Sequence, residues 1–346
     1  MKTQTWVRNL AGVIDSRATK ETDTVENILL LGLFRRVFLY ARINMALCAM
    51  IAILPFGADT CRAAEIQKAF ESPDAAFKAL LDGFNKNSDE AILGILGQDQ
   101  RDLVVQADKE EAADIRHKVY NCAQEHLQIV TNGDKATARL GIKDWPFPIP
   151  MVKHTDGWVF DTAAGKEEIL NRRIGENELN AISVCRAYVA AQKEYARRDR
   201  TGDKITQYAQ KFRSTEGKKD GLYWPAANGE PLSPMGPLVA EAHAEGYGQH
   251  PADGKPHPYQ GYYFHILTAQ GEAAPGGKMD YIVDGHLTKG FAFIATPSAW
   301  GASGIMTFIV NQDGKIFEKN LGPDYRKQEK PISEYNPDKS WEEVKD

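Results

Sequence analysis

The stretch "GFAFIATPSAWGASGIMTFIVNQDGKIFEKNLG", residues 290–322, carries the most regular pattern of the chain and decides the fold of its C-terminal half. Its apolar residues gather in short runs rich in Phe, Ile and Val, which is typical of strands. The step Asp313-Gly314 separates the last two runs and predicts a tight hairpin turn. The pattern therefore predicts three strands, at residues 290–296, 305–311 and 315–321.

Two further strand candidates precede this stretch, at residues 261–269 and 280–285. Before them, residues 177–197 have the apolar spacing of a long helix, with one side formed by Ile182, Cys185, Tyr188 and Val189. A Gly- and Pro-rich connection separates this helix from the strands. A helix followed by antiparallel strands predicts an α+β domain.

The N-terminal part repeats this order of elements. Ser72 stands before Pro73 in the arrangement typical of a helix start, and the apolar spacing predicts helices at residues 73–84, 91–96 and 110–126. From residue 135 onward the period changes to two, and Thr155-Asp156-Gly157 predicts a hairpin. Helices followed by a bent antiparallel sheet are similar to the cone-shaped domains of the nuclear-transport-factor-2-like class.

The length of 346 residues predicts two domains, at roughly 150 residues for each. The long helix then joins them, and its wide apolar stripe predicts that it is buried. We expect the α+β class throughout, with a leader at 1–64, an N-terminal α+β domain at 65–175, a C-terminal α+β domain at 176–330 and a polar tail at 331–346.

Several stretches resemble, in the same order, the signature segments of the bacterial family of unknown function numbered 2950. They are "WPFPIPMVK" (145–153), "GWVFDTAAGKEEILNRRIGENELNAI" (157–182), "DGLYWPAANGEP" (220–231), "GYYFHILTAQG" (261–271) and "GIMTFIVNQDGKIFEKNLGPD" (304–324). The resemblance covers about residues 66–325. It implies an exported bacterial protein with no assigned activity.

The C-terminal half also resembles the globular head of type IV pilins and pseudopilins. The shared features are a long helix and a following sheet that ends in the hairpin "TFIVNQDGKIF", residues 307–317. Pilins begin with an exposed apolar helix that drives assembly, whereas the long helix of this chain is internal. The resemblance therefore implies a pilin-like head and leaves polymerisation by that route open.

Residues 34–65, "FRRVFLYARINMALCAMIAILPFGADTCRAAE", have the order of a secretory signal: a positive region, an apolar run and small residues. The apolar run at 45–56 is shorter than the roughly 20 residues that a membrane-spanning helix requires. We expect cleavage near Ala64 and a periplasmic or secreted protein without a membrane span. Arg35-Arg36 leaves twin-arginine and general secretion open, and a start at Met45 or a retained membrane anchor are alternatives.

The charge pattern excludes some partners. The formal net charge is -5, and Lys and Arg are scattered among Asp and Glu, so no basic face indicates nucleic acid.

Asp199 and Asp203 are candidate calcium ligands, but the neighbouring positive charges of Arg198, Arg200 and Lys204 favour a solvated turn. Residues 271–280, "GEAAPGGKMD", lack the residues of a phosphate-binding loop. We expect neither a metal nor a cofactor.

Two cysteines, Cys122 and Cys185, follow the leader. An oxidising compartment would allow them to form a disulfide, but cysteines on helices are as often free core residues. Cys122 and His126 also face the same side of a predicted helix, where an imidazole can activate a thiol. We favour core and rim roles for this pair.

Ser303 lies between glycines in "WGASGI", residues 300–305. A nucleophile elbow requires a glycine two residues after the serine, where this chain has Ile305, and a helix afterwards, where a strand is predicted. We therefore interpret Ser303 as a turn residue between strands.

Aromatic residues stand beside prolines and glycines in "DWPFPIP" (144–150) and "DGLYWP" (220–225). Such residues at loop edges are candidates for a recognition surface. The candidates are Trp145, Phe147, Tyr223 and Trp224, with packing between the domains as the alternative.

We expect an exported protein that binds or scaffolds an envelope protein or a cell-surface component without catalysis. The alternative is a periplasmic hydrolase whose site residues meet only in space.

Overall fold

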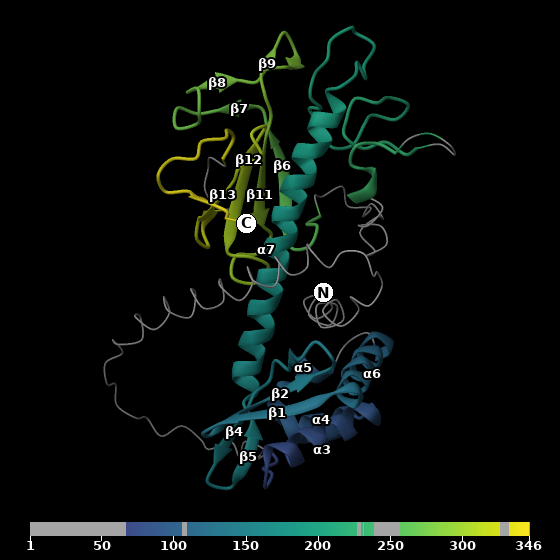
Figure 1. Ribbon diagram of the computed structural model, residues 1–346, viewed down its shortest axis with the longest axis vertical. Helices are drawn as coiled ribbons and strands as arrows, with labels where there is room; N and C mark the ends of the chain where they lie inside the picture. The colour runs from purple at the N-terminus through teal and green to yellow at the C-terminus, as the bar shows by residue number, and fades with distance from the viewer. Residues whose placement is uncertain are drawn as a thin grey trace. The chain divides into compact units, whose positions relative to one another are not determined.

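The structure is a computed structural model that describes residues 67–105, 109–226, 230, 232–238, 257–325 and 332–345. Helices and antiparallel sheets make up these parts, which confirms the predicted α+β class. The chain divides into two compact units, an N-terminal and a C-terminal unit, between Asn171 and Arg172 (Figure 1). The predicted leader at residues 1–64 lies outside the described residues.

Two helices of the N-terminal unit, those that follow Ser72 and Ser88, begin at side-chain caps. Ser72 Oγ accepts a hydrogen bond from Ala75 N at 3.1 Å, and Ser88 Oγ accepts one from Ala91 N at 3.2 Å. Each bond satisfies a backbone N–H group that has no partner within its helix. The helical segments are α3 (Pro73–Asn85), α4 (Asp89–Leu96), a 3₁₀ turn (Gln98–Gln100), α5 (Arg101–Val104) and α6 (Lys109–Glu125).

An antiparallel sheet completes the N-terminal unit, with the order β1-β2-β4-β5 and with β3 paired to β2. In β2 the side chains of Ala136, Ala138 and Leu140 are buried, and they belong to the same core as the apolar residues of the helices. The strands are β1 (Leu127–Asn132), β2 (Lys135–Leu140), β3 (Trp145–Pro146), β4 (Met151–His154) and β5 (Gly157–Phe160).

The long helix α7 spans Thr162–Tyr195 and begins earlier than the predicted start near Asn177. Asp161 Oδ1 accepts a hydrogen bond from Ala164 N at 3.0 Å at this start. Gly165, which weakens the sequence signal for a helix, is required by packing, because a Cβ atom there would lie 2.7 Å from the side chain of Ile149. The division between the two units falls inside α7.

The C-terminal unit contains a five-stranded antiparallel sheet with the order β14-β13-β12-β11-β6. Its strands are β6 (Tyr262–Leu267), β11 (Ala292–Pro297), β12 (Met306–Asn311), β13 (Ile316–Asn320) and β14 (Glu342–Glu343). Two short strand pairs accompany it: β7 (Ala269–Gln270) with β8 (Met279–Asp280), and β9 (Ile282–Val283) with β10 (His286–Leu287).

This sheet confirms the strands predicted from residues 290–322, because Val310 pairs with Ile316 across the hairpin that contains Asp313-Gly314. Gly314 has a φ of 81°, which favours glycine. The segment predicted as a polar tail supplies β14 and the buried side chain of Tyr335. The described part of this segment therefore belongs to the C-terminal unit.

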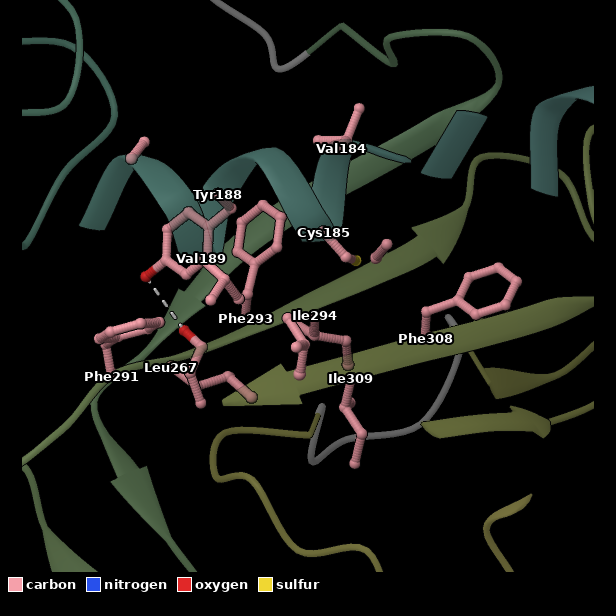
Figure 2. Packing of buried hydrophobic residues seen from close by; sticks show 14 of the residues in the cluster. Val184, Cys185, Tyr188, Val189, Leu267, Phe291, Phe293, Ile294, Phe308 and Ile309 are labelled. Carbon is pink, nitrogen blue, oxygen red and sulfur yellow. Dashed lines mark hydrogen bonds between the residues drawn. The ribbon is translucent and has the colours of Figure 1, made fainter. Parts of the chain in front are cut away.

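The core of the C-terminal unit lies between α7 and the sheet (Figure 1). The ring of Tyr188 stacks on that of Phe293, with centroids 4.1 Å apart and planes 9° from parallel (Figure 2). Tyr188 also donates a hydrogen bond to Ala292 O at 3.3 Å. Buried Gln192 donates to Tyr188 Oη at 2.9 Å and to Ala209 O at 2.8 Å. The stripe on α7 thus combines apolar packing with satisfied polar groups.

None of the helices in the described ranges has the length and apolarity that a membrane crossing requires.

The buried stripe leads to a stability prediction. Val189 lies within this core, whereas its neighbour Ala190 is exposed on the same helix. Val189→Asp would bury an unpaired charge, so we expect the free energy of unfolding to fall by about 3 kcal/mol or more. Ala190→Asp introduces the same group in water and should have little effect. Urea denaturation of both variants measures the difference, and equal stabilities would contradict the burial of this face of α7.

Candidate functional site

A pocket of about 150 Å³ lies in the C-terminal unit, beside the ends of β11 and β13. We name it the Trp300 pocket. Residues 297–300 and 321–323 line it, together with Thr307 and Tyr325. Prolines and aromatic rings therefore share the lining with hydroxyl groups, a composition that is typical of small-molecule sites.

Trp300 is 40% exposed, yet its ring is held in place. The indole Nε1 donates a hydrogen bond to Asn320 Oδ1 at 3.0 Å. The same oxygen accepts a second bond from Gly322 N at 2.9 Å, which ties it to the end of β13. The orientation of the indole is thus fixed by a strand that lies apart from it in sequence.

The turn between β11 and β12 carries Ser303. Its hydroxyl donates to Ala299 O at 3.2 Å and accepts hydrogen bonds from Ser298 Oγ at 3.1 Å and Ala299 N at 3.0 Å. A serine nucleophile requires a general base within hydrogen-bond reach. The partners of Ser303 are a hydroxyl and backbone groups, so these contacts support its interpretation as a turn residue.

Helix α7 anchors this turn from its central part. Buried Asn177 donates through Nδ2 to Ser303 O at 2.8 Å. Glu178 Oε1 accepts hydrogen bonds from Ile305 N at 2.9 Å and Met306 N at 3.0 Å. Gly304 is required because a Cβ atom there would overlap the hydroxyl of Tyr262. The turn that follows Trp300 is therefore held on one side by α7 and on the other by β6.

The aromatic candidates Tyr223 and Trp224 lie in the C-terminal unit. Trp224 is only 7% exposed and belongs to the core, with Arg200 and Lys219 placed 5.4 Å and 5.7 Å from its ring. Tyr223 is half-buried, and the guanidinium of Arg213 lies 5.9 Å from its ring. The burial of Trp224 gives this residue a packing role. Recognition by Tyr223 and Trp224 stays a prediction.

Trp145 and Phe147 lie in the N-terminal unit. Phe147 is 4% exposed and packs edge-to-face on Phe77, with centroids 5.2 Å apart. Trp145 is half-buried and makes a T-shaped contact with Phe147 at 6.3 Å. The ring contacts of both residues are with side chains of the core. A recognition role for them likewise stays a prediction.

Of the two cysteines, Cys122 lies in the N-terminal unit and Cys185 in the C-terminal unit, and their pairing in a disulfide stays a prediction. Cys185 has no exposed surface and lies in the core of the C-terminal unit, and this burial raises the pKa of its thiol to about 12. Thiol–disulfide exchange proceeds through the thiolate, which such burial disfavours. Cys122 is half-buried on α6, and its backbone carbonyl accepts a hydrogen bond from His126 N at 3.3 Å.

In the turn after α7, the carboxylate of Asp199 binds neighbouring backbone groups. Asp199 accepts hydrogen bonds from the backbone N–H groups of Gly202 at 2.7 Å, Lys204 at 2.9 Å and Thr201 at 3.0 Å. These bonds, led by that from Gly202, lower the pKa of Asp199. The interactions are those of a turn. Across the described ranges, no group of three or more His, Cys, Asp and Glu residues is placed to hold a metal ion.

The loop at 271–278, whose sequence partly resembles a phosphate-binding loop, is held by hydrogen bonds from buried Gln270. Its amide nitrogen donates to Pro275 O at 2.8 Å and Gly277 O at 2.7 Å, and its amide oxygen accepts from Tyr281 Oη at 2.8 Å. Burial raises the pKa of Tyr281, which keeps this donor protonated. The loop is therefore organised by internal hydrogen bonds.

A second cavity, of about 60 Å³, lies in the N-terminal unit among apolar side chains. The polar group at its wall is buried Arg116, which donates to Asn87 Oδ1 and Asp89 Oδ1 at 2.5 Å and to Val104 O at 2.8 Å. We interpret this cavity as a packing void.

Sequence reasoning missed Trp300, although the residue lies inside the stretch that decides the fold. A signal was present, because Trp300 stands beside Pro297, Ser298 and Gly301, a composition that is typical of a turn. Its partner Asn320 lies twenty residues further on, so the fixed orientation of the ring required the structure.

Comparison with curated proteins and with solved structures returned no match. The likenesses to nuclear-transport-factor-2-like domains and to pilin heads therefore stay predictions. A family model described as "Protein of unknown function (DUF2950)" matches residues 67–344. This match spans most of the chain and includes the Trp300 pocket. The chain belongs to the DUF2950 family.

Proposed function

We propose that the protein is exported and acts at the cell envelope as a binding module without catalysis. The observation that carries the proposal is the Trp300 pocket, in which an exposed tryptophan is fixed beside a cavity. Tryptophan is among the residues that contribute most to binding energy in recognition sites. The partner is an envelope protein or a cell-surface component.

The fixed indole of Trp300 favours binding energetically. Covering apolar surface contributes roughly 25 cal/mol per Å². A side chain that is already immobilised loses little rotamer freedom when a partner covers it. The hydrogen bond to Asn320 provides that immobilisation before any partner arrives. A periplasmic hydrolase has less support, because the hydroxyl of Ser303 contacts Ser298 and the backbone of Ala299 and, among the described residues, no general base.

Export rests on the sequence at residues 34–65, where a positive region, a short apolar run and small residues follow one another. We expect the mature chain to begin close to Glu65. Mass spectrometry of the protein isolated from its source organism measures this terminus. Changing Arg35-Arg36 to Lys-Lys should block export only if the twin-arginine route is used. A full-length cytoplasmic species would contradict the proposal.

Binding is tested by sedimentation of the mature protein with washed cell envelopes. We expect Trp300→Ala to weaken retention by about 2 kcal/mol of binding free energy, the typical effect of truncating a central aromatic. Val283→Ala is the matched control, since Val283 lies in the same unit and is 39% exposed. Retention that Trp300→Ala leaves unchanged would count against the pocket. A phenotype lost in Ser303→Ala at normal protein abundance, with Trp300→Ala behaving as wild type, would favour the hydrolase.

A further inference from the structure

The geometry points to a neutral saccharide ring as the ligand of the Trp300 pocket. This inference rests on the proposed binding function and names the class of ligand for the same site. It follows from three properties of the pocket: its size, the chemistry of its lining and the fixed position of its aromatic rings.

The size of the pocket fits one six-membered ring. Its volume is about 150 Å³, and an apolar protein cavity of roughly this volume holds one benzene molecule. A single sugar ring is of similar dimensions. The lining comes from two short segments, residues 297–300 and 321–323, together with Thr307 and Tyr325. The pocket is therefore compact, whereas recognition of an extended peptide uses a groove that follows several residues.

The described lining residues divide between apolar and hydroxyl-bearing side chains. Pro297, Pro323 and Leu321 provide apolar surface, and Ser298, Thr307 and Tyr325 carry hydroxyl groups. Among the residues that the structure describes, those that line this pocket bear no formal charge. A phosphate or carboxylate ligand would lose its hydration without gaining a counter-charge, which is unfavourable. The lining thus selects a neutral ligand with both apolar and hydrogen-bonding surface.

A sugar ring has these two kinds of surface. One face presents C–H groups, and its edge presents hydroxyl groups. The face of an indole carries negative charge density and attracts the positive C–H groups placed over it. Trp300 can supply this face, while the hydroxyl groups of the lining are of the type that bonds to sugar hydroxyls.

The two aromatic side chains of the pocket are held before a ligand arrives. Trp300 donates to Asn320 Oδ1 at 3.0 Å, and Tyr325 Oη accepts a hydrogen bond from Ile332 N at 3.1 Å. Ser298 is likewise bonded to Ser303, whose carbonyl accepts a bond from Asn177 of α7. Such preorganisation lowers the entropic cost of binding a small polar ring.

The inference is tested by titrating the full mature protein with soluble tetrasaccharides of glucose, galactose, mannose and N-acetylglucosamine. Calorimetry measures binding, and tryptophan emission reports on the indole. We expect at least one of the four to bind, and Trp300→Ala to weaken that binding about tenfold or more. Trp300→Phe keeps an aromatic face and should retain part of the affinity. Val283→Ala should bind as the wild-type protein does, because Val283 lies on β9 and is not among the lining residues of the pocket.

Melting temperatures of all variants separate a lost contact from a lost fold, and Tyr325→Ala provides a second variant of the same pocket. Failure of all four saccharides to bind would overturn the inference, as would binding that neither Trp300→Ala nor Tyr325→Ala weakens. A proline-rich peptide is tested in parallel. If that peptide binds through Trp300 and the saccharides do not, the ligand class is wrong while the binding function stands. Envelope retention that does not depend on Trp300 would count against the pocket, and an unchanged protein that envelopes do not retain would refute the binding function itself.

Discussion

The packing of helix α7 on the C-terminal sheet is the contact on which the other features of this unit depend. The stacked rings of Tyr188 and Phe293 fix the helix against the first half of β11 (Figure 2). Gln192, one turn further along, satisfies both backbone groups of Ala209 and so ties the returning chain to the same helix. Strand β11 is thereby held on its helix-facing side and by β6 and β12 on its edges.

The Trp300 pocket derives its rigidity from this arrangement. The pocket begins where β11 ends, and the turn that follows is bound to α7 through Asn177 and Glu178. The indole is oriented by Asn320, at the end of β13. An exposed aromatic ring is thus supported by one helix and two strands. A site on such a frame keeps its geometry better than one on a free loop.

The sequence predicted the features that depend on local order. Runs of β-branched and aromatic residues gave β11, β12 and β13, and Asp313-Gly314 gave the hairpin between the last two. The start of α7 was missed because Gly165 counts against a helix locally, while close packing on Ile149 requires it. The exposure of Trp300 and the burial of Trp224 depend on residues distant in sequence, so no local pattern revealed them.

The central claim is that ligands meet this protein at Trp300, and the indole N–H resonance of that residue reports on it most directly. The measurement is a nuclear magnetic resonance titration of the mature protein with saccharide released from purified cell envelopes. The account predicts that the Trp300 indole resonance shifts, while the indole resonances of Trp224 and Trp158, whose side chains are buried, stay in place. A shift at Trp224 without one at Trp300, or binding with no indole shift at all, would contradict it.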